Sequence, residues 1–183
     1  MKLRTNRLAC FLSLSLVFIS IADATSVPSM TFEELTDRSE IVVSGQVARS
    51  WSEWDSEHKF IWTHHELSVS SVHKGTPGSK VVVSEPGGVV GTQGMSVAGS
   101  VVYQPADRVF VFLQRMPNGY LRTTGWGQGK YTVDAKGRLH AETSFSGGFE
   151  LVGPQSLRSL DGMTVADVGE RIAARMRLQG GAR

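Results

Sequence analysis

The side chains of this sequence best suited to metal or acid–base chemistry are its five histidines: His58, His64, His65, His73 and His140. On an extended run His64 and Glu66 share a face, and an imidazole beside a carboxylate can provide two ligands for Zn²⁺. No cysteine follows residue 10, and no His-x-x-x-His spacing supplies the remaining ligands of a tetrahedral site. Solvent-exposed strand histidines are therefore the preferred interpretation. The alternative is a small periplasmic metal-binding protein or hydrolase that uses His64, His65 and Glu66, with His140 as a further candidate.

A hydrolase would also need an activated nucleophile. Ser144 and Ser146 lie in the segment Ser-Phe-Ser-Gly-Gly, which is not a Gly-x-Ser-x-Gly elbow. His140 lies nearby and Asp134 could orient it, but a triad rarely converges from residues this close on one hairpin. Thiol chemistry is excluded after residue 10 because no cysteine is present there. We therefore favour a non-catalytic domain without a metal or cofactor.

Residues 85–99 are rich in glycine and invite comparison with a phosphate-binding loop. Such a loop directs its amides from the start of a helix and is usually followed by Lys and Ser or Thr. Neither a helical pattern nor a Gly-Lys-Ser/Thr sequence follows residues 87–94. We expect a wide, ordered loop whose glycines serve turns and close backbone approach, and we include it in the candidate binding surface.

Aromatic and charged residues gather at the tip of a predicted hairpin. Trp54 and Trp62 occupy even positions, which the alternation of the strands turns away from the core, and Glu53, Asp55 and His64 surround them. Outward aromatic rings beside mixed charge indicate a binding surface. These five residues are the predicted ligand-binding site, and its partner is another envelope or extracellular protein or a sugar. The alternative is that the two tryptophans only cover each other as a cross-strand pair.

Two long extended runs carry this tip. In the first, Ile41, Val43 and Val47 alternate with polar residues, and a weaker alternation continues through residues 60–72. The pattern predicts a hairpin over residues 40–75. Residues 109–113 are apolar at every position, which predicts a central strand buried on both faces.

Helices are predicted only near the two ends of the chain. Thr31 and Glu34 have the spacing of a capping box before a short helix at residues 32–38. Thr164 and Asp167 have similar spacing before an apolar stripe, which places a second helix at residues 164–178. The segments between them are short strands separated by Gly/Pro turns, so the fold class is mainly β, a small barrel or sandwich with a helix at each end.

Three short sequences carry a resemblance: Ser-Glu-Ile-Val-Val-Ser-Gly-Gln-Val, Val-His-Lys-Gly and Arg-Val-Phe-Val-Phe-Leu. Together with the order of elements over residues 31–133, they resemble an uncharacterised group of secreted bacterial proteins. More remotely, the layout is similar to netrin-like domains, the OB-type barrels that include the tissue inhibitors of metalloproteinases. The resemblance implies an OB-like barrel with terminal helices packed against it. That family inhibits through a disulfide-tethered N-terminal cysteine, which this chain lacks, so the inhibitory mechanism does not carry over.

The first 24 residues have the pattern of a secretory signal peptide. A basic start is followed by an apolar segment at residues 8–21, too short for a typical membrane span, and by small residues at Ala22 and Ala24. We expect cleavage between Ala24 and Thr25, which leaves one domain at residues 25–183 without a stable membrane anchor. The expected location is secreted or periplasmic.

Removal of this leader also changes the charge of the chain. The remaining residues carry equal numbers of basic and acidic side chains, so the alkaline pI belongs mostly to the leader. A formally neutral chain gives no support for binding to nucleic acid or to an anionic membrane surface.

Overall fold

The computed structural model describes residues 26–141, 150–152 and 160–181. The predicted signal peptide at residues 1–24 and the candidate nucleophiles Ser144 and Ser146 lie outside the described residues. The elements follow one another in this order: β1 (Ser26–Pro28), α1 (Phe32–Arg38), β2 (Ile41–Trp54), β3 (Ile61–Lys74), β4 (Lys80–Pro86), β5 (Gly88–Val90), β6 (Gln93–Met95), β7 (Arg108–Arg115), β8 (Leu121–Thr123), the 3₁₀ helix η1 (Trp126–Gly129), β9 (Lys130–Val133), β10 (Leu139–Ala141), β11 (Glu150–Val152) and α2 (Val165–Gly180).

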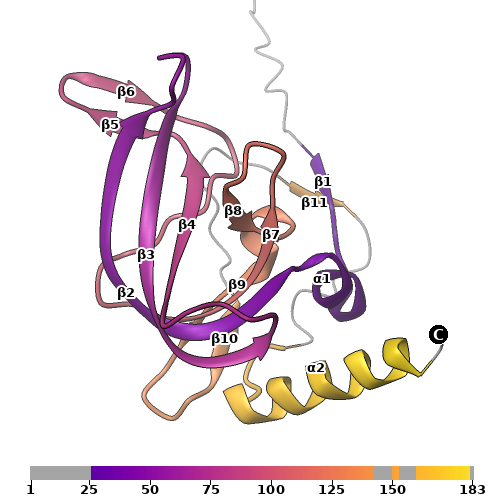
Figure 1. Ribbon diagram of the computed structural model, residues 1–183. Coiled ribbons are helices and arrows are strands. Elements are labelled where there is room, and N and C mark those ends of the chain that lie inside the picture. The colour runs from indigo at the N-terminus through magenta and orange to yellow at the C-terminus, as the bar shows by residue number, and fades with distance from the viewer. Residues whose placement is uncertain (1–25, 142–149, 153–159, 182–183) are drawn as a thin grey trace, which may run out of the picture.

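Five of these strands close into a small barrel (Figure 1). β2 and β3 form one long antiparallel hairpin, β4 pairs antiparallel with β3, and β7 pairs antiparallel with β2. β8 closes the ring because it pairs in parallel with β4, at Val83 and Leu121, and antiparallel with β7. β9 and β10 extend the sheet from β7. This strand order is that of an OB-type barrel, and the predicted mainly β fold class is confirmed.

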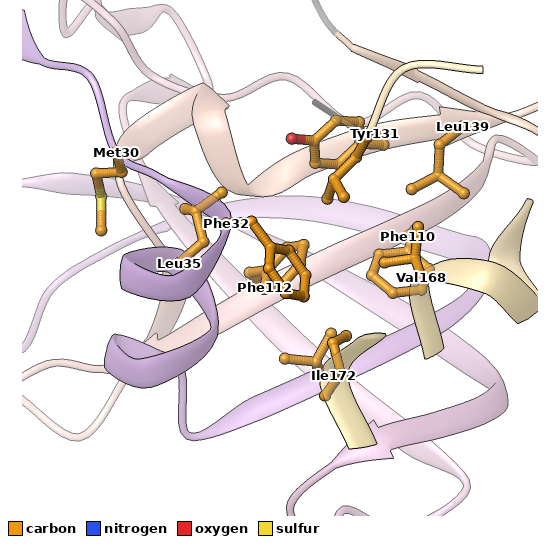
Figure 2. Packing of buried hydrophobic residues seen from close by; sticks show 11 residues of the cluster. Met30, Phe32, Leu35, Phe110, Phe112, Tyr131, Leu139, Val168 and Ile172 are labelled. Atoms are coloured by element: carbon orange, nitrogen blue, oxygen red, sulfur yellow. The ribbon is translucent and has the colours of Figure 1, made fainter. Parts of the chain in front are cut away.

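The predicted central strand is β7. Residues 109–113 have no exposed surface, as their apolar sequence predicts. Val109, Val111 and Leu113 belong to the cluster inside the barrel, whereas Phe110 and Phe112 point to the opposite face. There the two rings lie among side chains of α1, α2, β9 and β10 (Figure 2). The barrel therefore has an inner core and a second core beneath the helices, and β7 belongs to both.

Both helices begin where the sequence places them. The Thr31 hydroxyl accepts a hydrogen bond from the Glu34 N–H, and the Glu34 carboxylate accepts one from the Thr31 N–H. Thr164 and Asp167 make the same reciprocal pair at the start of α2. These capping boxes satisfy amides that have no partner within the helix, which is why the boundaries could be predicted.

The two tryptophans of the predicted site lie on opposite faces of the hairpin. In the register of β2 and β3, Trp54 pairs with Ile61 and Trp62 pairs with Glu53. A register shift between Val47 and Arg49 places an extra residue in β2, which reverses the sense of the alternation from there to the tip. The prediction that both rings point away from the core on one face, and the alternative that they cover each other, are therefore both wrong.

The glycine-rich segment contains a second hairpin instead of the expected wide loop. β5 and β6 pair antiparallel from Gly88 opposite Met95 to Val90 opposite Gln93 (Figure 1). Gly91 adopts φ 61°, which suits the tight turn between them. A Cβ at Gly88 would lie 2.3 Å from the Thr63 hydroxyl. The interpretation of the glycines as residues for turns and close approach is thus confirmed.

Candidate functional site

A cleft of about 510 Å³ lies beside β4 on the outer side of the barrel. Leu67 of β3 faces the inner core, so the alternation of the strand turns His64 outward, where it pairs with Ser84 of β4. Glu53 from β2 and Tyr120 from the turn between β7 and β8 also line the cleft. We call this site the outer cleft and define it by Glu53, His64, Ser84 and Tyr120.

His64 is the most unusual side chain of the outer cleft. It is only 4% exposed, and its Nδ1 lies 2.8 Å from the Ser84 hydroxyl. Its Nε2 lies 3.2 Å from the Glu53 carboxylate, but the direction of the contact makes no hydrogen bond, so this buried nitrogen has no hydrogen-bond partner. Burial lowers the pKa of His64 although the Glu53 charge opposes the shift, so the imidazole is neutral at pH 7.

Aromatic rings surround this imidazole. Trp51 stacks on His64 with ring centres 5.3 Å apart, and Tyr120 meets it edge-on at 5.4 Å. Tyr120 also meets Trp62 edge-on at 5.1 Å. Of the predicted residues, Glu53, Trp62 and His64 are therefore brought together, and Tyr120 is the residue that joins them.

The cations at the rim of the outer cleft already have partners. Lys80 lies 2.7 Å from the carboxylate of Glu66, and Arg115 lies 2.7 Å from that of Glu40. Opposite charges at this distance largely cancel each other's field at the surface. The cleft thus offers aromatic faces and hydrogen-bonding groups, with no strong field of one sign.

The other two predicted site residues lie away from the outer cleft. Trp54 stacks on His58 within the hairpin tip, with ring centres 6.0 Å apart. The Asp55 carboxylate accepts a hydrogen bond from the Lys59 N–H at 2.7 Å, and this bond lowers the pKa of Asp55. Both residues shape the turn that joins β2 to β3.

The alternative cluster of His64, His65 and Glu66 is not assembled. His65 faces the opposite side of the strand from His64, and the Glu66 carboxylate is held by Arg49 at 3.0 Å and by Lys80. The bonds from Lys80 and Arg49 lower the pKa of Glu66. In the part of the chain that the structure describes, no group of three or more His, Cys, Asp or Glu residues could hold a metal ion.

His140, the further candidate, lies in β10, directly after the turn that joins β9 to β10. Its Nε2 lies 3.1 Å from the Asp134 carboxylate, and both side chains are partly exposed. Bonds from the Arg138 N–H and from His140 lower the pKa of Asp134 to about 2. The pair of His140 and Asp134 that the sequence suggested therefore exists. It stabilises the turn between β9 and β10 and includes no residue of the outer cleft.

Sequence reasoning missed Ser84, Trp51 and Tyr120. Trp51 continues the odd positions of Val43 and Val47, and strict alternation would place it on the core face, but the register shift in β2 turns it outward. Ser84 ends a run of valines and carries no signal of its own. Tyr120 follows a recognisable Pro-Asn-Gly turn, but only the closure of the barrel brings this turn to β3, and no local pattern contains that information.

None of the helices described is long and apolar enough to cross a membrane. A scan of protein families finds none that matches this chain, and a search of curated proteins finds no match either. The candidate site is therefore defined by its own geometry: a buried imidazole with one nitrogen unbonded, enclosed by aromatic rings on the outer face of β3 and β4.

Proposed function

We propose that this protein is a secreted or periplasmic, non-catalytic binding domain that holds its partner in the outer cleft. The observation that carries the proposal is the buried Nε2 of His64, which has no hydrogen-bond partner, in a ring that contacts those of Trp51 and Tyr120. A buried polar atom left without a partner costs about 1–3 kcal/mol, so its presence calls for a functional explanation. The half-exposed Glu53 carboxylate lies beside this nitrogen. A partner oxygen that takes the place of that carboxylate and accepts the hydrogen bond recovers the cost.

The chemistry of the cleft favours a sugar as the partner, with a segment of another protein as the second choice. The Glu53 carboxylate beside Nε2 favours the proton on that nitrogen, so His64 donates while the half-exposed Glu53 accepts. A hydroxyl group can satisfy both because it accepts and donates at once. The rings of Trp62 and Tyr120 offer apolar faces on which the C–H side of a sugar ring can rest.

The position of the cleft in the fold also supports a binding function. In OB-type barrels, ligands commonly bind on the face of the second and third strands and at the loops that join strands one to two and four to five. In this chain those strands are β3 and β4, and the loops are the β2–β3 tip and the β7–β8 turn that carries Tyr120. The proposed extracellular location rests on the N-terminal sequence pattern.

Tyr120→Ser is expected to weaken partner binding by about 30-fold, because truncating an aromatic residue at the centre of an interface costs about 2 kcal/mol or more. The partner is identified by titrating the protein with maltotriose and tri-N-acetylchitotriose and by co-purification from the native envelope. NMR shifts of the Trp62 and His64 side chains then report binding to wild type and variant.

Trp54→Ser is the matched control, because it removes a ring of similar exposure from the opposite face of the same hairpin. It should bind the partner as wild type does. Equal binding by wild type and Tyr120→Ser, or a loss confined to Trp54→Ser, would move the binding site away from the outer cleft.

A second candidate function is hydrolysis, favoured by one observation. Ser84, His64 and Glu53 form a chain in which a hydroxyl meets one imidazole nitrogen and a carboxylate lies beside the other. Ser84 is only 2% exposed, which restricts attack on a substrate. If these three side chains are catalytic, a fluorophosphonate will label the wild-type protein at Ser84 and will not label Ser84→Ala. Absence of labelling in wild type removes this function.

A further inference from the structure

A second cavity, of about 450 Å³, lies at the mouth of the barrel on the opposite face of β3 from the outer cleft. His65 and Glu85 form part of its floor, because they continue the inward-facing positions of Leu67 and Val83. Its walls come from the β5–β6 hairpin and the segment that follows, namely Val89, Met95, Val97 and Val101. We call this cavity the inner pocket. Its volume lies within the range of sites that hold small molecules.

The hairpin that covers the inner pocket is fixed at its base. The Thr63 hydroxyl donates a hydrogen bond of 2.6 Å to the carbonyl of Gly87, and the Ser100 hydroxyl donates one of 2.6 Å to the carbonyl of Pro86. Gly88 adopts φ 137° where the chain passes over β2 and β3, a conformation open to glycine. The pocket is therefore formed before a ligand arrives, which lowers the entropic cost of binding.

One nitrogen of His65, a residue that lines this pocket, makes no hydrogen bond within the described residues. The side chain is 4% exposed, and its Nδ1 lies 2.7 Å from the Ser50 hydroxyl. Within the described residues, its Nε2 makes no hydrogen bond, and the ring lines the cavity. Burial, with Lys130 and His64 nearby, lowers the pKa of His65 to about 4, so the ring is neutral at pH 7.

The Glu85 carboxylate on the floor of the pocket has partners within the protein. One oxygen of Glu85 accepts a hydrogen bond of 2.9 Å from the Thr123 N–H, and the other lies 3.3 Å from the guanidinium of Arg122. Burial raises the pKa of Glu85, and the Arg122 charge and the bonds from Thr123 oppose that rise. Lys130, the buried cation nearest His65, donates a hydrogen bond of 2.6 Å to the carbonyl of Val102. A charged head that enters this floor loses its water, at a cost of several kcal/mol, and an ammonium head is also repelled by Lys130.

From these features we infer that the inner pocket is a second binding site, distinct from the outer cleft, for an uncharged small molecule with an apolar body and a hydroxyl or amide head. The apolar body contacts Val89, Met95 and Val97, and the head hydrogen-bonds to the free nitrogen of His65. A neutral imidazole either donates or accepts, which suits a hydroxyl or an amide equally. The cost of removing water from a charged group selects against ammonium and carboxylate heads.

The test compares three probes that share the same alkyl chain and differ in their head groups: octan-1-ol, octanoate and octylammonium at pH 7. Octan-1-ol should bind saturably with one molecule per chain and shift the NMR signals of the Met95 methyl group and the His65 ring. The two ions should bind at least about tenfold more weakly, since tenfold corresponds to only 1.4 kcal/mol of the cost of burying a charge. Equal binding of the three probes, or no saturable binding of octan-1-ol, overturns the proposal.

Variants then place the probe within the fold. Met95→Trp, and independently Val97→Trp, fill the pocket and should reduce octan-1-ol binding by about tenfold or more. Val90→Trp adds the same ring to the same hairpin at a position that does not line the pocket, and Tyr120→Ser alters only the outer cleft, so both should bind as wild type does. Undiminished binding by both filled variants overturns the inner pocket as the site. Because Tyr120→Ser separates the two sites, this result stands independently of the function proposed for the outer cleft.

Discussion

Phe112→Asp is expected to prevent folding. Phe112 is fully buried beneath the helices, with its ring centre 5.6 Å from that of Phe110 and 6.4 Å from that of Tyr131. A carboxylate at this position would have no counter-ion, and an unpaired buried charge costs several kcal/mol of a total stability of about 5–15 kcal/mol. Circular dichroism during heating and in urea should show no cooperative transition for the variant.

Val72→Asp is the matched control for this prediction. Val72 lies in β3, on the far side of β2 from β7, and is 47% exposed, so the new carboxylate stays in water. Its cost should be within about 1 kcal/mol, as for most surface substitutions. If Phe112→Asp melts cooperatively within a few degrees of wild type, β7 does not separate two buried cores.

The parts of this fold that could be predicted are those fixed by short-range chemistry. Thr31 with Glu34 and Thr164 with Asp167 satisfy helix amides within one turn, so each boundary is contained in four residues. The uninterrupted apolar run of β7 likewise identified a strand with two buried faces. Such features need no knowledge of where the rest of the chain lies.

The candidate site depends on features that local patterns do not contain. One extra residue in β2, beside Arg49, reverses which tryptophan faces outward, and a period of two cannot reveal a single inserted residue. Tyr120 reaches His64 only because β8 closes the barrel against β4. Predicting the site from sequence therefore recovered Glu53, Trp62 and His64 of β2 and β3. It missed Trp51 of β2 and the side chains supplied by β4 and the β7–β8 turn.

The same limit applies to His65, which the sequence suggested as a metal ligand and which is instead a buried, neutral base. Its ring lies 4.8 Å from that of Tyr103, and burial together with the charge of Lys130 and then His64 lowers its pKa to about 4. The ordinary pKa of histidine in an unfolded chain is about 6.5. Between these two values the unfolded chain binds a proton at this residue and the folded chain does not.

His65 should therefore make the protein less stable as the pH falls. Because the unfolded state binds more protons between pH 6.5 and 4, the free energy of unfolding rises with pH across that window and is unaffected by His65 above it. The expected loss from pH 7 to pH 5 is about 2 kcal/mol, and about 3 kcal/mol once the pH is below 4. Urea unfolding at several pH values measures this dependence.

The glutamine of His65→Gln stays neutral at every pH in this range. Between pH 7 and 5 the free energy of unfolding of this variant should therefore fall by about 2 kcal/mol less than that of wild type. The lost contact with Tyr103 lowers its stability at pH 7 but does not change this difference. His58→Asn is the control: His58 is exposed at the hairpin tip with φ 54°, a left-handed conformation that asparagine accepts. Protonation of the carboxylates as the pH falls lowers the free energy of unfolding equally in all three proteins. Only the difference between their curves of unfolding free energy against pH therefore reports on His65. Parallel curves for wild type and His65→Gln would show that the imidazole takes up its proton in the folded state and would contradict its burial as a neutral base.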